Sequence, residues 1–526
     1  MQVPGRRREI ASVAHTTPPE AAFCDLDRQP PSGATGFHQW QRRSRRDGAV
    51  GEAILFSFCS LSSGLLVRIG AIAGSAMVLA ACAAPEPTVR ATEQEPPVAL
   101  VSAPAGPIVP RATGGLAELI DAPQAAVAGE RLNVELMRRF YARHGFAPVW
   151  QTRQEQAASL VNAISRAGDH GLSPDLFHAD LLRSSATLPA LDRELLLTNA
   201  FLAYADALAR GAAPVERRRD DEILTPEPID VAATLDAALG STDPAAAIEA
   251  LAPTTPTYRL LRQALRDRSA AGAVAGRTGP RAREIEVNLE RERWLPRRLP
   301  ADRVWVNVAD GRLVLYRDDQ PVFTTRVIVG QTDRRNQSPE FQASIDGFWF
   351  NPPWSVPKDI ATEEILPKAS RDPTYLARHN MVTLPDGGLQ QLGPNSALGQ
   401  LMFHMDNRFD VYLHDTPSKE LFSRDDRRFS HGCIRVENPR QLAALLMQQP
   451  IDAIDQGIAT GNTSWNALPK PVPVFVVYET AFADGDGVVQ FRPDIYGRDA
   501  GIAQLLDPRR KAVAQRVAPG LSASRR

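Results

Sequence analysis

The fold and chemistry of this chain are organised around the stretch Ser430-His431-Gly432-Cys433-Ile434-Arg435, read together with His414-Asp415-Thr416 upstream. A cysteine attacks carbonyl groups only as its thiolate, and an ordinary thiol, with a pKa of roughly 8.5, is only slightly ionised at neutral pH. A nearby histidine can accept the proton, and peptide N–H groups can stabilise the charge that develops on a substrate oxygen. These two stretches are therefore the candidate catalytic centre.

The two histidines stand at different distances from the thiol. His431 precedes Cys433 by two residues, a spacing that places both side chains on one face of an extended segment. His414 precedes Cys433 by nineteen residues and reaches the thiol only if the polar run 416–428 forms a returning loop. Gly432 allows the backbone to approach a substrate closely, and the N–H groups around it are candidates for an oxyanion hole.

Two other interpretations of the same residues compete. A single cysteine after a glycine is most often a small buried hydrophobic residue. His414, Asp415, His431 and Cys433 also form a possible zinc site, although they lack the paired spacing of the common zinc motifs.

A longer pattern decides between these interpretations. His414, fifteen intervening residues and then Ser430-His431-Gly432-Cys433 resembles the signature of the L,D-transpeptidase catalytic domain. The resemblance covers roughly residues 116–500 and points to the large, lid-bearing subfamily. It rests also on Asn288-Leu289-Glu290-Arg291, Arg293-Trp294-Leu295-Pro296, Asn351-Pro352-Pro353-Trp354, Val356-Pro357, Gly393-Pro394, Leu398-Gly399, His414-Asp415-Thr416-Pro417, Tyr478-Glu479-Thr480-Ala481 and Asp494-Ile495-Tyr496-Gly497-Arg498-Asp499.

The resemblance implies a role for each residue of the centre. Cys433 is expected to be the nucleophile and His414 the general base and acid. The backbone carbonyl of Asp415 is expected to orient the His414 ring. The other residues expected to line the site or its oxyanion hole are Ser430, His431 and Gly432.

Three further residues are candidates for substrate contact. Arg435 stands where many members of the family have asparagine; its guanidinium suits a substrate carboxylate, or it is a surface charge. Tyr412 lies two residues before His414, on the same face, and either contacts substrate or packs. Trp354 is expected at the groove wall.

The N-terminal sequence indicates export. Residues 69–81 are apolar but too short for a comfortable transmembrane helix, and they resemble the hydrophobic part of a secretory signal. The ending Leu79-Ala80-Ala81-Cys82 resembles a bacterial lipobox, in which Cys82 is lipidated; an ordinary signal peptide is the alternative. Ala83 replaces the aspartate typical of inner-membrane retention, which favours the outer membrane of a Gram-negative bacterium. Residues 1–65 then form a doubtful leader, and we expect the true start near Leu66.

The cysteine count supports a reactive thiol. The sequence contains four cysteines, at positions 24, 59, 82 and 433. If the chain starts near residue 66 and Cys82 is lipidated, Cys433 is the one free thiol of a periplasmic protein. An unpaired thiol in an oxidising compartment is more often reactive than structural.

Hydrophobic periodicity predicts an α+β organisation, with a helical scaffold domain followed by a β-rich domain. The resemblance implies that the β-rich domain is the catalytic one and that its loop-rich insertion is a lid. The period changes from helical to alternating near residue 302. Predicted helices include one capped by Asn133, then 155–167, 195–210, 258–266 and one capped by Asn438; predicted strands are 304–308, 313–316, 322–329, 341–350, 402–405, 409–413, 472–478 and 488–491. The predicted segments are a leader (1–65), signal (66–82), linker (83–115), scaffold (116–270), connecting helix (271–301), catalytic domain (302–480) with a loop-rich lid (about 355–400), C-terminal hairpin (481–506) and disordered tail (507–526).

Larger relatives carry a helical peptidoglycan-binding module before the segment that corresponds to 288–291. Here the linker Ser269–Arg281 is too short for three helices, so we expect that module to be absent.

The sequence therefore predicts a peptidoglycan L,D-transpeptidase that acts by cysteine acyl transfer, with release of D-alanine from a tetrapeptide stem. Alternatives are an L,D-carboxypeptidase or exchange enzyme that uses the same acyl-enzyme, and a non-catalytic, membrane-tethered wall-binding protein. The expected partners are stem peptides and, through the lipid, a membrane; the implied chemistry needs no cofactor or metal. The net charge of −1 gives no reason to expect nucleic-acid binding.

Overall fold

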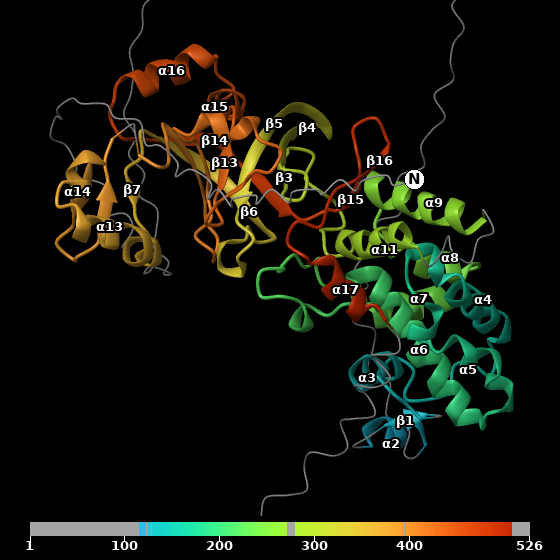
Figure 1. Ribbon diagram of the computed structural model, residues 1–526. Coiled ribbons are helices and arrows are strands. Elements are labelled where there is room, and N and C mark those ends of the chain that lie inside the picture. The colour runs from blue at the N-terminus through green and yellow to red at the C-terminus, as the bar shows by residue number, and fades with distance from the viewer. Residues whose placement is uncertain (1–114, 123–124, 128, 271–278, 394–395, 508–526) are drawn as a thin grey trace, which may run out of the picture. The chain divides into compact units, whose positions relative to one another are not determined.

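The structure is a computed structural model that describes residues 115–122, 125–127, 129–270, 279–393 and 396–507 (Figure 1). The predicted leader, the signal segment and Cys82 lie outside these residues, as do all but one residue each of the linker 83–115 and the tail 507–526. No helix in the described ranges is long and apolar enough to cross a membrane.

The first described region is helical. Asn133 begins α3 as predicted, because its side chain accepts a hydrogen bond from the N–H of Leu136 at 3.2 Å. The long helix α6 has fourteen buried residues, and an extensive hydrophobic core surrounds it. The elements are α2 (Leu116–Asp121), β1 (Ala126–Val127), β2 (Glu130–Arg131), α3 (Val134–Ala142), α4 (Gln154–Ser165), α5 (Ala179–Arg183), α6 (Ala190–Arg210), α7 (Val231–Leu239), α8 (Pro244–Glu249) and α9 (Pro256–Ala270).

A nine-stranded mixed sheet forms the second region, after helix α11 (Pro280–Glu292). The strand order is β12-β5-β13-β11-β10-β6-β14-β3-β4, and β5 also pairs with β4. The eight strands from β5 round to β4 therefore form a closed ring of pairings. The nine strands of the sheet, of which β12 lies outside the ring, are β3 (Arg303–Asn307), β4 (Arg312–Arg317), β5 (Gln320–Gly330), β6 (Phe341–Phe350), β10 (Leu401–Met405), β11 (Leu413–His414), β12 (Arg428–Ser430), β13 (Ile434–Val436) and β14 (Ser464–Val477).

Alternation along these strands builds the second core. In β3, Val304 and Val306 are fully buried in this core, whereas Trp305 packs against the core of the helical region. Helices α15 (Pro439–Met447) and α16 (Ile451–Ala459) add Leu442, Leu446 and Ile454 to the sheet's core. The chain is thus an α+β protein with a helical region followed by a β-rich one.

Two local predictions were wrong. The predicted strand 409–413 is reduced to β11, because Asn407 organises a turn: its side-chain oxygen accepts the N–H groups of Phe409 and Val411, and Asp410 has φ +52°. Asn438 does not cap α15 with its side chain, whose amide instead donates to the Thr325 hydroxyl at 3.1 Å.

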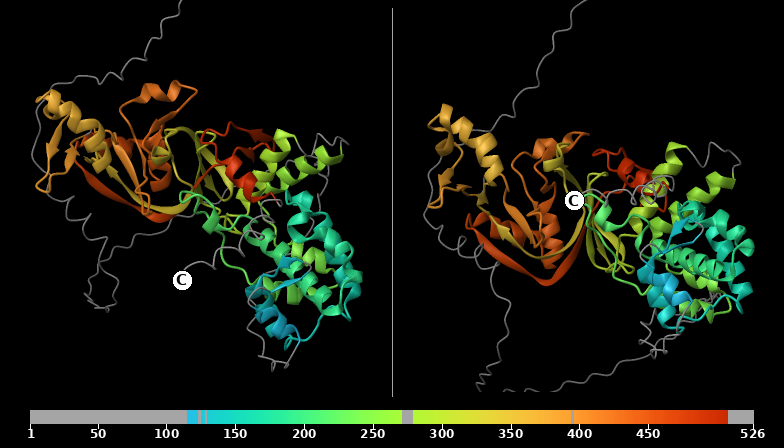
Figure 2. Two further views of the ribbon diagram at one scale, coloured as in Figure 1. Left: turned by 60° about the horizontal axis from the view of Figure 1, so that its bottom comes forward. Right: turned by 90° about the horizontal axis from the view of Figure 1, so that it is seen from below.

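The segment predicted as a loop-rich lid has its own secondary structure. Its strands form a separate three-stranded sheet in the order β7-β9-β8, and Ala361, Ile365 and Leu389 form a small separate core. Figures 1 and 2 show these elements gathered beside the main sheet. They are β7 (Trp354–Ser355), α12 (Lys358–Ile360), a π-helical turn (Ala361–Ile365), α13 (Leu366–Arg371), α14 (Tyr375–Arg378), β8 (Met381–Thr383) and β9 (Leu389–Gln391).

The last elements of the described part of the chain return to α11. A short hairpin of β15 (Ala481–Ala483) and β16 (Val489–Phe491) precedes α17 (Asp499–Leu505). Arg291 of α11 donates to Asp499 at the start of α17 at 2.6 Å.

Candidate active site

The catalytic motifs meet because β11 and β13 are neighbours in the sheet. They pair in parallel, with Leu413 opposite Ile434 and His414 opposite Arg435. Leu413 and Ile434 lie in the core. His414 and Arg435 therefore lie on the outer face, together with the positions two residues before them, Tyr412 and Cys433.

His414 is held in one orientation. The side chain is buried, and its Nδ1 lies 2.5 Å from the backbone carbonyl oxygen of Asp415, the contact expected from the resemblance. The carbonyl can only accept, so Nδ1 carries the proton and Nε2 is the basic nitrogen. Burial and the positive charge of Arg435 lower the pKa of His414 to about 4, so its ring is neutral at pH 7.

Cys433 is a partly buried free thiol. Burial raises its pKa above the ordinary value, while the backbone N–H of Tyr412 and the charge of Arg435 act in the opposite direction. The resting pair is therefore a neutral thiol and a neutral imidazole. In this state the thiol has to lose its proton as it attacks, rather than before the substrate binds.

Ser430 shapes the turn that presents the thiol. Its hydroxyl donates to the carbonyl of Cys433 at 2.5 Å and accepts the N–H of Gly432 at 3.2 Å. The Gly432 N–H, expected as an oxyanion donor, is thus engaged within the loop. Gly432 has φ +110°, a conformation that side chains rarely adopt.

His431 makes its hydrogen bond with the lid. Its Nε2 lies 2.6 Å from a carboxylate oxygen of Glu364, in the π-helical turn of the lid. The expectation that His431 and Cys433 share one face required an extended segment, which the conformation of Gly432 interrupts. His431 therefore joins the catalytic loop to the lid.

The three candidate substrate contacts have different surroundings. Arg435 is partly exposed, and its buried Nε has no hydrogen-bond partner among the described residues. Tyr412 is half-buried beside the thiol, and burial raises its pKa to about 12. Trp354 instead packs against the small core of the lid.

Asp415 supports the site through both its backbone and its side chain. One carboxylate oxygen pairs with Lys419, and the other accepts the N–H of Gln400 at 2.9 Å. Among the described residues, no group of three or more His, Cys, Asp or Glu side chains is placed to hold a metal ion. The four residues of the zinc interpretation therefore do not converge.

The sequence did not reveal the role of Ser338. Its hydroxyl donates to the carbonyl of Gly432 at 2.8 Å and accepts the N–H of Gly330 at 3.0 Å. Its own carbonyl accepts a hydrogen bond from Arg498 at 2.9 Å. Arg498 also contacts Asp221 of the helical region at 2.9 Å and Glu340 at 3.1 Å. A hydrogen-bonded path thus runs from the helical region to the catalytic loop.

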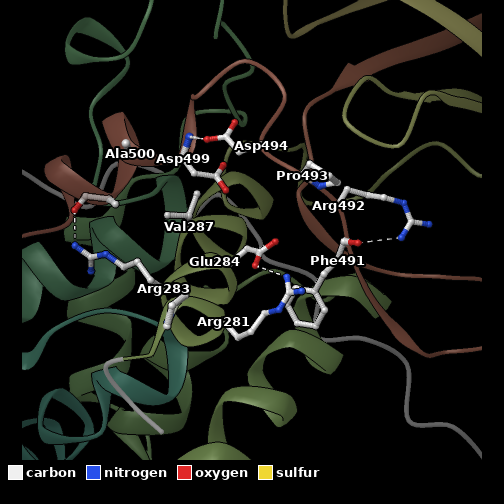
Figure 3. Close-up of a pocket in the computed structure, with 12 residues that line it drawn as sticks. Arg281, Arg283, Glu284, Val287, Phe491, Arg492, Pro493, Asp494, Asp499 and Ala500 are labelled. Carbon is white, nitrogen blue, oxygen red and sulfur yellow. Dashed lines mark hydrogen bonds and ion pairs between the residues drawn. The ribbon is translucent and has the colours of Figure 1, made fainter. Parts of the chain in front are cut away.

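One pocket lies away from the candidate catalytic pair. It has a volume of about 540 Å³ and is lined from α11, β16 and α17 (Figure 3). Its three lining arginines are all paired: Arg281 with Glu284 at 2.7 Å, Arg283 with the Ala503 carbonyl at 2.7 Å, and Arg492 with Asp310 at 2.5 Å. None of the predicted catalytic residues lines it.

The fold and site define a β-rich domain with a Cys–His pair on one sheet face, a lid, and a helical region before it. Residues 301–474 match the family model of the L,D-transpeptidase catalytic domain, and residues 135–265 match the Scaffold domain. The chain therefore carries an L,D-transpeptidase catalytic domain preceded by a Scaffold domain.

One curated protein and one solved structure were compared with this chain. The chain is 33% identical over 222 residues to a Haemophilus influenzae protein named "Putative L,D-transpeptidase"; the match covers 38% of this chain and 45% of that protein. The chain thus spans less than half the length of this curated relative. A crystal structure of a mutant Enterococcus faecium L,D-transpeptidase is 11% identical over 34% of this chain and 50% of that one, with a TM-score of 0.18, which is too low to define a common fold.

Proposed function

We propose that the protein is a peptidoglycan L,D-transpeptidase in which Cys433 carries the acyl group. The observation that carries the proposal is the placement of His414 and Cys433 on one face of adjacent strands, within a domain that matches the catalytic family model. The donor is a tetrapeptide stem, and the attacked carbonyl belongs to its third residue.

The reaction follows from the protonation states of the resting pair. Nε2 of His414 accepts the proton of Cys433 as the sulfur forms its bond to the carbonyl carbon. The tetrahedral intermediate then collapses, the bond to D-alanine breaks, and His414 protonates the leaving amine. A side-chain amine of a second stem attacks the thioester, forms the cross-link and regenerates the thiol.

Arg435 is proposed to bind the carboxylate of the leaving D-alanine. It lies next to His414 across β11 and β13, and the residue is partly exposed although its Nε is buried. A guanidinium binds a carboxylate through two parallel hydrogen bonds. Tyr412 is proposed to contact the stem beside the thiol.

Intact-mass measurement tests the acyl transfer. The full chain is incubated with a disaccharide-tetrapeptide, beside the Cys433→Ala variant. We expect an adduct equal in mass to the donor minus D-alanine on the wild type alone. Release of D-alanine by Cys433→Ala, or no adduct and no release with the wild type, would contradict the proposal. Adding an acceptor stem then separates cross-linking from hydrolysis, since only the former yields a dimer.

We further propose a periplasmic protein tethered to the outer membrane through lipid on Cys82. The support is the ending Leu79-Ala80-Ala81-Cys82 after an apolar segment. Metabolic labelling with a radioactive fatty acid tests it. Wild type and Cys433→Ala should be labelled and Cys82→Ala should not; label on Cys82→Ala would exclude this anchor.

A further inference from the structure

The outer face of the sheet carries a continuous row of side chains that ends at the candidate catalytic pair. Successive registers place Trp465 of β14 opposite Trp349 of β6, Trp349 opposite Met402 of β10, and Met402 opposite His414 of β11. Partners in a register point to the same face of a sheet. Trp465, Trp349 and His414 therefore share the face that presents the thiol.

The next row adds polar groups to the same face. His404 lies opposite Gly347 and pairs with Asp346 at 2.8 Å. Its ring is 6.4 Å from that of Tyr412 in a stacked arrangement and 5.8 Å from that of Trp465 in an edge contact. A group of aromatic rings thus continues from the side of the thiol to Trp465, with a carboxylate and an imidazole at its edge.

Trp465 lies over a glycine. A Cβ added at Gly347 would stand 2.4 Å from the Trp465 ring, so the ring covers the space left by the missing side chain. The Trp465 residue is nevertheless 37% exposed, and the Trp349 ring lies 5.3 Å from it. We name Trp465, Trp349, His404 and Asp346 the aromatic platform.

We propose that the aromatic platform binds the sugar of the acyl donor. The inference rests on the proposed function. The face of an aromatic ring carries negative electrostatic potential and attracts the weakly positive C–H groups of a pyranose ring. Carboxylate and imidazole groups beside it can bind hydroxyl and amide groups of the same sugar.

The spacing suits a sugar-linked stem. Trp465 is three strands from His414, about 14 Å at the usual separation of neighbouring strands. The attacked carbonyl is separated from the sugar by three stem residues, about 10 Å when extended, and by the linking group. Arg435 lies on the opposite side of His414, where the released carboxylate would lie. The donor would then cross the strands from β13 towards β14, with its carboxylate at Arg435 and its sugar at Trp465.

The decisive experiment compares two donors that differ only in the sugar. Rates of acyl-enzyme formation per donor concentration are measured with the disaccharide-tetrapeptide and the free tetrapeptide, on full-length wild type, Trp465→Ala and Trp465→Phe. Trp465→Ala should lower this rate about tenfold for the sugar-linked donor, at the low end of the effect of removing an aromatic ring stacked on a nucleic-acid base, and should change it by less than about twofold for the free peptide. Trp465→Phe should recover part of the lost rate. Val488→Ala, a control at an exposed position between β15 and β16, should have the wild-type rate on both donors.

Equal losses on both donors would show a structural role for Trp465 and overturn the inference. A wild type that does not prefer the sugar-linked donor would overturn it as well, while leaving the proposed function intact. Calorimetric binding of both compounds to Cys433→Ala, with and without Trp465→Ala, decides the question without catalysis. Sugar-dependent binding lost with Trp465 would support the platform even if no acyl-enzyme formed.

Discussion

At the scale of single residues, the protonation of the pair determines when the thiol becomes reactive. Burial raises the pKa of Cys433, and burial with the Arg435 charge lowers that of His414 to about 4. Both changes disfavour a standing thiolate–imidazolium pair, because each opposes the charged form of its group. The free enzyme would therefore resist indiscriminate alkylation.

The first prediction concerns the pH dependence of that alkylation. The rate of Cys433 alkylation by iodoacetamide should be low at pH 7 and rise continuously towards pH 10, because the thiolate forms only near and above the raised pKa. Mass spectrometry of the full chain, with Cys433→Ala to subtract other cysteines, measures it. A plateau already present at pH 6 would mean that an ion pair exists and that the prediction is wrong.

Arg435 gives a second prediction at this scale. Its charge lowers the pKa of Cys433, so Arg435→Gln should move the alkylation profile to higher pH. Arg440→Gln, on α15 and paired with Asp455 at 3.0 Å, is the matched control and should not move it. A shift of the Arg435→Gln profile to lower pH would contradict the stated electrostatics.

At the scale of elements, the sequence predicted those helices and strands whose bounds are determined by alternating hydrophobicity or by a capping side chain. The alternating pattern of 341–350 predicted β6 with its observed bounds, and Asn133 predicted the start of α3. The strand 409–413 failed because the side chain of Asn407 satisfies the local backbone, a contact that periodicity does not encode. The lid looked irregular because its strands are two or three residues long, too short for a period to appear.

The candidate site divides in the same way. The expected roles of Cys433 and His414 came from a resemblance that rests on a short contiguous motif. The parallel register of β11 and β13 brings the two residues to one face of the sheet. Ser338 could not be found, because a lone serine gives no signal until the fold brings it to Gly432, 94 residues away in sequence. Trp354 was expected at the groove wall, but it packs against the small core of the lid, whose fold the sequence did not reveal.

The lid contact gives a prediction at the element scale. Glu364→Ala removes the partner of His431, so amide hydrogen exchange in 358–371 should become faster by a measurable factor. The pair is partly exposed, with 30% and 47% of the two side chains accessible, so overall stability should change by less than about 1 kcal/mol.

The neighbouring residue provides the control for this experiment. Glu363→Ala removes the contact with Arg335 at 3.2 Å and leaves His431 paired. The rate of Cys433 alkylation is a second measurement on the same variants. This rate should therefore change with Glu364→Ala and not with Glu363→Ala. Equal effects of the two substitutions would show that general loosening of the lid, rather than the His431 contact, is responsible.

At the scale of the whole chain, buried charges join the Scaffold domain to the catalytic domain. The N–H of Glu340 donates to the carbonyl of Asp221 at 2.7 Å, and the N–H of Ile223 donates to the carbonyl of Glu340 at 3.2 Å. The side chain of Arg498, a residue that is only 1% exposed, forms ion pairs with the carboxylates of Asp221 and Glu340. Because the same guanidinium also binds the Ser338 carbonyl, one side chain takes part both in the contact between the domains and in the support of the catalytic loop.

Arg498→Ala should therefore destabilise both the contact between the two domains and the catalytic loop. Removing one partner from a buried ionic group leaves charge without compensation, a loss of about 3–5 kcal/mol. Thermal unfolding should show a lower midpoint, and acyl-enzyme formation below that midpoint should also be slower. Arg334→Ala, whose pair with Asp220 is exposed at 69% and 84%, should leave both unchanged. A wild-type midpoint for Arg498→Ala would contradict this account.

Glu340 makes the same cluster sensitive to pH. Burial, together with the nearby Glu222 carboxylate, raises the pKa of Glu340 from 4.5 to about 7, against the opposing charges of Arg291 and Arg498. Between these pH values the folded state retains a proton that the unfolded state has released, so the contribution of Glu340 to the free energy of unfolding falls as pH rises from about 4.5 to 7.

Glu340→Gln imitates the protonated carboxyl, and its free energy of unfolding should decrease less over this range than that of the wild type. Denaturant unfolding at pH 5 and pH 7 measures the difference, with Glu118→Gln at an exposed position of α2 as control. If the wild type and Glu340→Gln changed in parallel between the two pH values, Glu340 would be ionised throughout and Arg498 would hold a fully charged pair of carboxylates.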